Sequence, residues 1–326
     1  MQLIVSEDVK YITKFDISDT PKGTIAHYWM KLVSDGFGSP ICIPVMVARG
    51  LKDGPILGVT AAVHGNELNG ISVIQRLFGE IDAQELRGTI VGIPVVNVPA
   101  FQRKRRRFVD GTDLNHIMPG KKSGNVSQVY AYRFMKLLAT KFEYLLDLHT
   151  ASTGRINSYY VRADMNDPVV REMALLQNAD IIVHNPASDG TLRGSSAKVG
   201  IKAITVEVGN PNTFQKKLIR SGIEGVHNVL CHLDMIDDEI IEAEKETVLC
   251  EKSKWMYTAK GGFLTVSVDL RELVKKGQEV ASLRNVFGKS IEKYYAPFDG
   301  IVIGKSVDPV NKSGGRILHL GKVKEE

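Results

Sequence analysis

Cysteine is scarce in this 326-residue chain, and no apolar run is long enough to cross a bilayer. The three cysteines are Cys42, Cys231 and Cys250, and none forms a CxxC pair. Their odd number and spacing argue against a disulfide framework, so we expect reduced thiols. The longest apolar runs, 56–63 and 89–98, have the length of strands, which predicts no membrane span. The N-terminus lacks the basic start and apolar middle of a secretory signal, so we expect a cytoplasmic protein.

Biased tracts are also absent, and the composition is typical of a globular protein, with 43% apolar and 24% charged residues. The length exceeds that of a usual single core, which predicts one large unit and a smaller one. The acidic, polar stretch IDDEIIEAEKE marks the expected boundary between domains at 1–245 and 246–326. The net charge of +5 includes a basic run at 103–107. No aromatic residue interrupts that run, so nucleic-acid binding is not expected.

Strand-like and helix-like segments alternate between residues 40 and 235, which predicts an α/β fold with a mostly parallel mixed sheet flanked by helices. The strands are expected at 56–63, 88–96, 144–148, 180–184 and 203–208, and the helices at 70–80, 127–140, 167–179, 193–199 and 214–235. After residue 255, short β-type runs alternate with glycines, which predicts a small all-β unit.

Three side chains with metal-ligand chemistry fall at the ends of predicted strands. His64 and Glu67 lie on one exit loop with two residues between them, and His149 follows LLDL at the end of another strand. Carboxyl ends of parallel strands meet at one edge of a sheet, so these side chains are expected to converge. A catalytic zinc site takes three such ligands and keeps a position open for water. Taken singly, the His64–Glu67 pair and His149 are each better explained by a structural role than by metal binding.

The order of four segments makes the joint pattern more specific: GVTAAVHGNELNG, GTDLNHIMPG, LLDLHTAS and ITVEVG. This order resembles the succinylglutamate desuccinylase and aspartoacylase family, a branch of the zinc carboxypeptidase-like hydrolases. The resemblance implies that His64, Glu67 and His149 bind one Zn²⁺ per chain, and that Glu207 is the general base. A carboxylate at a strand end, partly buried, is also physically suited to take a proton from an attacking water.

An arginine is needed where the amide carbonyl becomes an oxyanion. In the family this arginine lies shortly before the DLN segment, and local alignment of RFVDGTDLN places it at Arg107, with Arg106 as the second candidate. For Arg103, Lys104 and Arg105 the alternative is kept that the run is a solvated basic loop or a patch for polyanions.

The second segment departs from the family, because the usual DLNR is DLNH here. The resemblance implies that Asn115 helps to bind a substrate carboxylate, whereas His116 replaces the arginine that would grip it. Arg193 is a candidate to bind the substrate carboxylate in place of the missing arginine. That Arg193 is only a surface arginine at the start of a helix is an equal alternative. The identity of the substrate is therefore open.

The C-terminal unit is similar to biotinyl and lipoyl carrier barrels in VKKGQEVA and APFDGIV. Lys289 and Lys293 lack the sequence context of a carrier lysine, so we interpret the unit as a barrel-like lid that narrows access to the zinc. A deacylase of small N-acylated amino acids or related amines is the leading hypothesis. A zinc carboxypeptidase and an inactive metal-bound binding module are the alternatives. We expect a small-molecule substrate as the partner and no binding to a membrane. The sequence does not decide whether the chain forms a homo-oligomer.

Overall fold

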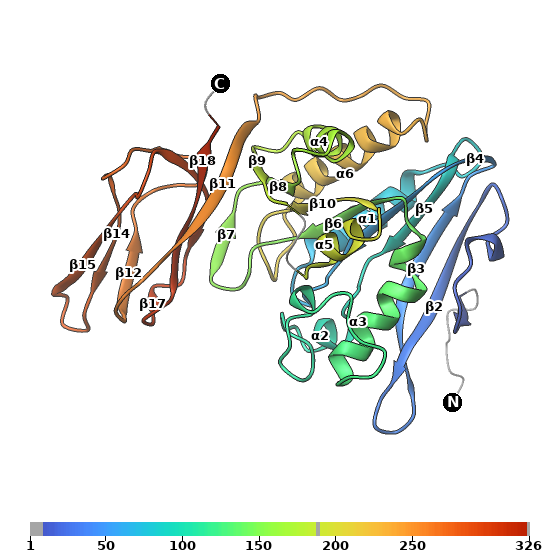
Figure 1. Cartoon of the computed structure of the whole chain (residues 1–326), viewed down its shortest axis with the longest axis horizontal. Helices are drawn as coiled ribbons and strands as arrows, with labels where there is room; N and C mark the ends of the chain where they lie inside the picture. The colour runs from blue at the N-terminus through green and yellow to red at the C-terminus, as the bar shows by residue number, and fades with distance from the viewer. Residues whose placement is uncertain (1–8, 187–189, 325–326) are drawn as a thin grey trace.

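The computed structural model describes residues 9–186 and 190–324. One large sheet forms the centre, in the order β1-β2-β3-β5-β4-β6-β10-β8-β9-β11-β18-β16-β13, and a second sheet has the order β15-β14-β12-β17 (Figure 1). The first half of the chain supplies the strands β1 (Lys10–Ile12), β2 (Thr24–Ser34), β3 (Pro40–Arg49), β4 (Lys52–Ala61), β5 (Arg87–Ile93), β6 (Tyr144–His149), β7 (Arg155–Asn157) and β8 (Tyr160–Ala163). The others are β9 (Ile181–His184), β10 (Lys202–Glu207), β11 (Val248–Tyr257), β12 (Gly262–Val266), β13 (Leu273–Val274), β14 (Glu279–Arg284), β15 (Ser290–Tyr295), β16 (Gly300–Ser306), β17 (Val310–Asn311) and β18 (Arg316–Val323).

Helices cover both faces of the large sheet. They are α1 (Asn69–Glu80), α2 (Val98–Gln102), α3 (Val126–Leu137), α4 (Pro168–Leu175), α5 (Leu192–Ala197) and α6 (Lys216–His232), with short 3₁₀ turns at Ile17–Asp19, Leu114–His116 and Ala139–Lys141. Side chains of α1, α4 and α6 share one hydrophobic cluster with one face of the sheet. Those of α3 and α5 belong to a cluster on the other face. Among the described helices, none is both long and apolar enough to span a membrane. The cytoplasmic location stays a prediction.

The middle of the sheet is parallel, because β5, β4, β6 and β10 all pair in the same direction. Alternation decides which side chains reach which face: Leu145 joins the cluster of α3, whereas Leu146 joins that of α1. Every predicted strand and helix between residues 56 and 235 has a counterpart. The antiparallel pair β2–β3 and the short strands β7 and β8 were not predicted.

The C-terminal strands form a β-unit beside the α/β part (Figure 1). It has its own apolar cluster, in which Val280, Leu283 and Leu318 are fully buried. The large sheet nevertheless continues into it, since β11 pairs with β9 and β16 pairs with β7. The division at residues 245 and 246 therefore stays a prediction.

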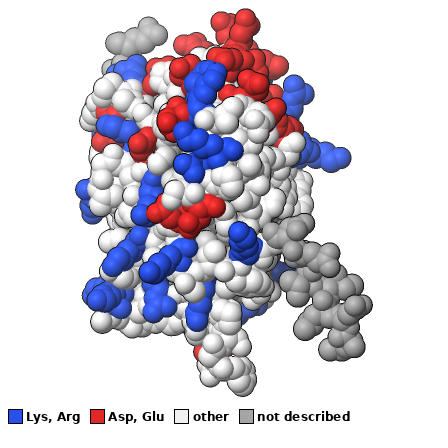
Figure 2. All heavy atoms as spheres, turned by 90° about the vertical axis from the view of Figure 1, so that its right-hand side faces the viewer, with Lys and Arg blue, Asp and Glu red and all other residues white. Residues whose placement is uncertain are grey.

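Charge is unevenly distributed on the face opposite the β-unit. Figure 2 shows aspartate and glutamate gathered mainly at the upper end of this face, whereas lysine and arginine are spread over both halves. A net charge of +5 thus does not make this face uniformly basic.

Candidate metal centre and active site

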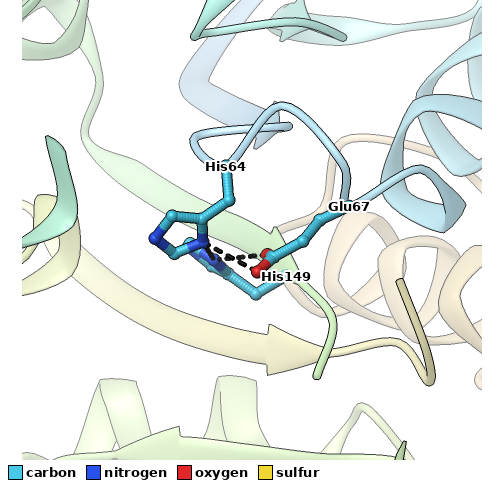
Figure 3. Close-up of side chains that lie close together, drawn as sticks. All are labelled: His64, Glu67 and His149. Carbon is cyan, nitrogen blue, oxygen red and sulfur yellow. Dashed lines mark hydrogen bonds and ion pairs between the residues drawn. The ribbon is translucent and has the colours of Figure 1, made fainter. Parts of the chain in front are cut away.

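The three predicted ligands converge at the carboxyl ends of β4 and β6. The His64 and His149 Nδ1 atoms are 3.3 Å apart, and the Glu67 carboxylate is 2.8 Å from the first and 3.0 Å from the second. One ligand atom from each residue lies within 4.8 Å of the others. All three side chains are buried and point toward one another (Figure 3).

The loop between β4 and α1 positions two of the ligands. It begins with a tight turn in which the Glu67 amide donates to the His64 carbonyl at 3.0 Å. Gly65 lets this turn approach α2 closely, because a Cβ atom there would lie 2.1 Å from the Ala100 carbonyl carbon. The Asn69 side chain donates to the Val208 carbonyl at 2.6 Å, which ties the start of α1 to the end of β10.

Each histidine is held by a carboxylate behind it. His149 Nε2 is 2.8 Å from Asp147 Oδ2, and His64 Nε2 is 3.0 Å from Asp113 Oδ1. Asp147 also accepts a 2.7 Å hydrogen bond from the Thr60 hydroxyl. A carboxylate partner at Nε2 leaves the Nδ1 lone pair for a metal. The donor set and its orientation therefore fit Zn²⁺, which favours His and Glu ligands.

Electrostatics suit a cation at this position. Burial opposes the charge of Glu67, but His64 and His149 outweigh it and hold the pKa of this carboxylate below its ordinary value. Burial likewise opposes the charge of His149, yet Asp147 and Glu67 raise its pKa well above the usual value. A cation binding at Nδ1 displaces a proton, so metal affinity should rise with pH.

Glu207 ends β10 directly beside His149, since the two residues are partners in the parallel register of β10 and β6. Both line the same cavity of about 230 Å³. The Glu207 side chain is 12% exposed and accepts a 3.2 Å hydrogen bond from Asn157 Nδ2. Burial raises the pKa of this carboxyl, against the opposing effect of the Arg162 charge. A carboxylate with a raised pKa is a stronger base.

Of the two candidate arginines, the structure places Arg106 in the cavity and Arg107 outside it. Arg106 donates to Glu67 Oε1 at 2.7 Å and pairs with Asp113 Oδ2 at 3.1 Å. Arg107 is exposed, and its Nη1 donates to the Gly111 carbonyl at 2.9 Å. The geometry thus favours Arg106, the second candidate, because the loop turns the Arg107 side chain toward solvent, and the role of either arginine stays a prediction.

The expected substrate-binding residues also line the cavity. Asn115 Oδ1 accepts from the Leu192 amide at 2.8 Å, which joins the DLNH segment to α5. His116 is 69% exposed in its side chain and lies 4.0 Å from Asp113. Arg193 is buried and donates to the Asn185 carbonyl at 2.9 Å, so it is no surface arginine.

Sequence reasoning missed part of the cavity wall: Asp113 behind His64 and the lining residues Arg155, Asn157, Arg162, Trp255 and Arg316. Asp113 could have been found from the sequence, because it is the first residue of the DLN segment. The other residues lie in β7, β8, β11 and β18, which come together only through long-range strand pairing.

Comparisons with known proteins give one matching family and several relatives. The sequence profile of the succinylglutamate desuccinylase/aspartoacylase catalytic domain matches residues 53–233. A similar curated protein is the N-alpha-acetyl-L-2,4-diaminobutyric acid deacetylase of Halomonas elongata, with 23% identity over 298 residues, or 87% of each chain. A succinylglutamate desuccinylase of Pseudomonas paraeruginosa is 26% identical over 180 residues, or 51% of this chain and 54% of that one.

Solved structures match over nearly the whole chain. The product-bound ectoine utilization protein EutE of Ruegeria pomeroyi aligns with a TM-score of 0.85 and 22% identity, covering 93% of this chain and 97% of that one. A succinylglutamate desuccinylase/aspartoacylase of Rhodobacter sphaeroides aligns with a TM-score of 0.83 and 22% identity, covering 94% of this chain and 98% of that one. This likeness confirms the predicted fold class.

Proposed function

The chain belongs to the succinylglutamate desuccinylase/aspartoacylase family, and we propose that it is a zinc-dependent hydrolase that removes the acyl group from a small N-acylated amino acid. One ion per chain would be held by His64, Glu67 and His149. The observation that carries the proposal is that Glu207 opens into the same cavity as this buried, carboxylate-supported ligand group.

Two side chains of the cavity wall, Glu207 and Arg106, have chemical roles in the proposal. A bound zinc ion lowers the pKa of a water ligand toward about 7 and polarises a carbonyl. Glu207 takes the proton of the attacking water and passes it to the departing nitrogen. Arg106, oriented by Asp113, donates to the oxygen that gains charge.

Substrate binding involves the residues at the C-terminal end of the DLN segment, whereas Asp113 at its start orients Arg106. We propose that Asn115 and Arg193 bind the α-carboxylate, with His116 contributing a weaker monodentate contact in place of the family arginine. Arg193 is suited to this role because Asn185 already fixes its guanidinium beside the cavity. The related enzymes' names specify acetylated and succinylated amino acids, which supports this substrate class.

A peptidase and an inactive module are weaker proposals. The cavity of about 230 Å³ includes Trp255 and Arg316 of the β-unit in its wall, which leaves little room for a polypeptide. An inactive module would not need a buried base, yet Glu207 lies beside the ligands with a raised pKa.

The test combines metal analysis with turnover. The purified protein should contain about one zinc per chain and release free amine from some acetylated or succinylated amino acids. Glu207→Gln should keep the zinc but lose about 10²–10⁴-fold in kcat, because only the base is removed. Glu85→Gln, an exposed control, should leave kcat unchanged. Absence of stoichiometric metal, or full activity of Glu207→Gln, would contradict the proposal.

A further inference from the structure

The carboxylate of Glu207 needs neighbours to fix its plane. The last side-chain torsion of a glutamate is broad, so the position of Glu207 at the end of β10 does not by itself orient the two oxygens. These oxygens have different partners. Oε2 accepts the 3.2 Å hydrogen bond from Asn157 Nδ2, whereas Oε1 lies 3.9 Å from Arg162 Nε. The amide of Asn157 therefore makes the shorter of these two contacts.

Asn157 is bound to the end of β10 a second time, through its backbone. The residue is buried, and its backbone amide donates to Asn210 Oδ1 at 3.2 Å. Asn210 follows Glu207 in the loop after β10, and its own amide donates to Gln215 Oε1 at 2.6 Å. Asn157 thus contacts both the proposed base and the loop that follows it.

The other side of Asn157 faces the β-unit. Asn157 ends β7, which lies between the two parts of the molecule, and its partner in the antiparallel register is Gly304 of β16 (Figure 1). A Cβ atom at Gly304 would lie 2.4 Å from Asn157 Oδ1, so the amide occupies the space that a side chain there would fill. Ser158 donates to the Ile303 carbonyl from its backbone amide at 2.9 Å and from its hydroxyl at 3.0 Å. Strand β16 therefore fixes the place of Asn157.

The chemistry of the two groups explains how the amide is turned. An ionised carboxylate only accepts hydrogen bonds, so the NH₂ group of Asn157 faces Glu207 and its carbonyl oxygen faces Gly304. A neutral amide donates a weaker hydrogen bond than a guanidinium does. It therefore orients the carboxylate with little loss of basicity.

We propose that Asn157 is the positioning residue of the general base Glu207, and that Gly304 of the β-unit sets the place of Asn157. This inference rests on the proposed function and deepens it, because the β-unit then acts on the base as well as narrowing the cavity. A displacement of about 1 Å in a reacting group can cost about 10²-fold in rate. The effect of Asn157 is therefore expected in kcat rather than in substrate binding.

The first experiment measures kcat, KM and bound zinc for full-length Asn157→Ala. The substrate is the acetylated or succinylated amino acid that the unsubstituted protein hydrolyses fastest. The kcat should fall by about 10²-fold, whereas KM and the zinc content should change little. Asn166→Ala, at an exposed asparagine, is the matched control and should leave all three unchanged. An unchanged kcat in Asn157→Ala, or a loss explained by KM or by missing zinc, would overturn the proposal.

Gly304→Ala tests the part assigned to the β-unit. Its Cβ should displace the Asn157 amide and lower kcat, again with little change in KM. Combined with Asn157→Ala it should cause little further loss, because the atom that it displaces is then gone. Gly261→Ala is the matched control in the same unit, where a Cβ meets nothing closer than the Asn311 carbonyl oxygen at 3.4 Å. Losses that multiply in the double variant would reject the link through Asn157.

Thermal unfolding separates this inference from the proposed function, because it needs no turnover. Asn157→Ala should lower the unfolding temperature, and the decrease should be smaller in the Glu207→Ala background, where the hydrogen bond is already absent. Such non-additive shifts would support the placement of Glu207 by Asn157 even if no acylated amino acid were hydrolysed. Additive shifts would reject it. Hydrolysis with an unchanged kcat in Asn157→Ala would keep the enzyme and reject the positioning role.

Discussion

Asp147 shows how a single residue can orient a candidate metal centre without being one of its predicted ligands. It has no exposed surface, and its two oxygens have different partners, His149 Nε2 at 2.8 Å and the Thr60 hydroxyl at 2.7 Å. The two-residue spacing of Asp147 and His149 puts both side chains on one face of β6. The carboxylate thereby fixes the tautomer and orientation of the ligand.

Asp147→Asn should lower zinc affinity by about 10–100-fold, because an amide no longer holds the imidazole as a carboxylate does. Competition with a chelator of known affinity measures the change. Thr60→Val removes one hydrogen bond to Asp147 but keeps the charge of Asp147, so the loss of zinc affinity in this variant should be smaller. A thermal unfolding curve shows whether either variant is folded. Unchanged zinc affinity in Asp147→Asn would exclude a role for this carboxylate in metal binding.

At the scale of elements, the loop from β4 to α1 is the part whose exact path matters most. His64 and Glu67 come from this loop, and Gly65 between them lies against the backbone of α2. Asn69, the first residue of α1, is bound to β10 through Val208. The loop is therefore fixed at both ends and in its middle.

Gly65→Ala should destabilise the protein by about 1–3 kcal/mol and weaken zinc binding, because the new Cβ would overlap the Ala100 carbonyl carbon. Gly79→Ala is the matched control on α1, where a Cβ meets nothing within 4 Å. That variant should gain about 0.5–1 kcal/mol from helix propensity. Thermal unfolding and zinc titration of both variants measure the contrast. Equal behaviour of the two would show that the loop has room at Gly65.

At the scale of the whole molecule, the β-unit is joined to the α/β part by continuous pairing and by packing. Val248 and Cys250 of β11 pair with Ile181 and Val183 of β9. Cys250, Ile301 and Ile303 share a buried cluster with residues of β8 and β9. Arg271 also forms a 3.0 Å ion pair with Asp180. The unit thus covers an edge of the central sheet as well as forming part of the cavity wall.

Deletion of residues 246–326 should lower the unfolding temperature and promote association, because it exposes the β9 edge and its apolar cluster. Thermal unfolding and size-exclusion chromatography measure the two effects. Phe287→Ser, at a side chain that is 90% exposed in the β14–β15 turn, is a control that should change neither. A monomeric truncated chain with the original unfolding temperature would mean that the β-unit is independent of the rest.

Local patterns predicted most of the α/β part and its catalytic candidates. Strand β6 and helix α1 follow from apolar periodicity within a short window, and so does the position of His149 at a strand end. The four segments that carry the family resemblance predicted the three metal ligands and Glu207 as the base. The same segments did not distinguish Arg106 from Arg107, because a one-residue difference in a loop depends on how its backbone turns.

The sequence by itself determined the fold class and the residue types that the proposed chemistry needs, because periodicity and short motifs are local properties of the chain. Only the tertiary structure decided which residues line the cavity. Arg155 lies in a strand of three residues, and Trp255 and Arg316 lie 61 positions apart in the β-unit. Their meeting depends on the pairing of β7 with β16 and of β11 with β18. Such contacts between distant segments arise from the packing of whole sheets, which no short window of sequence records.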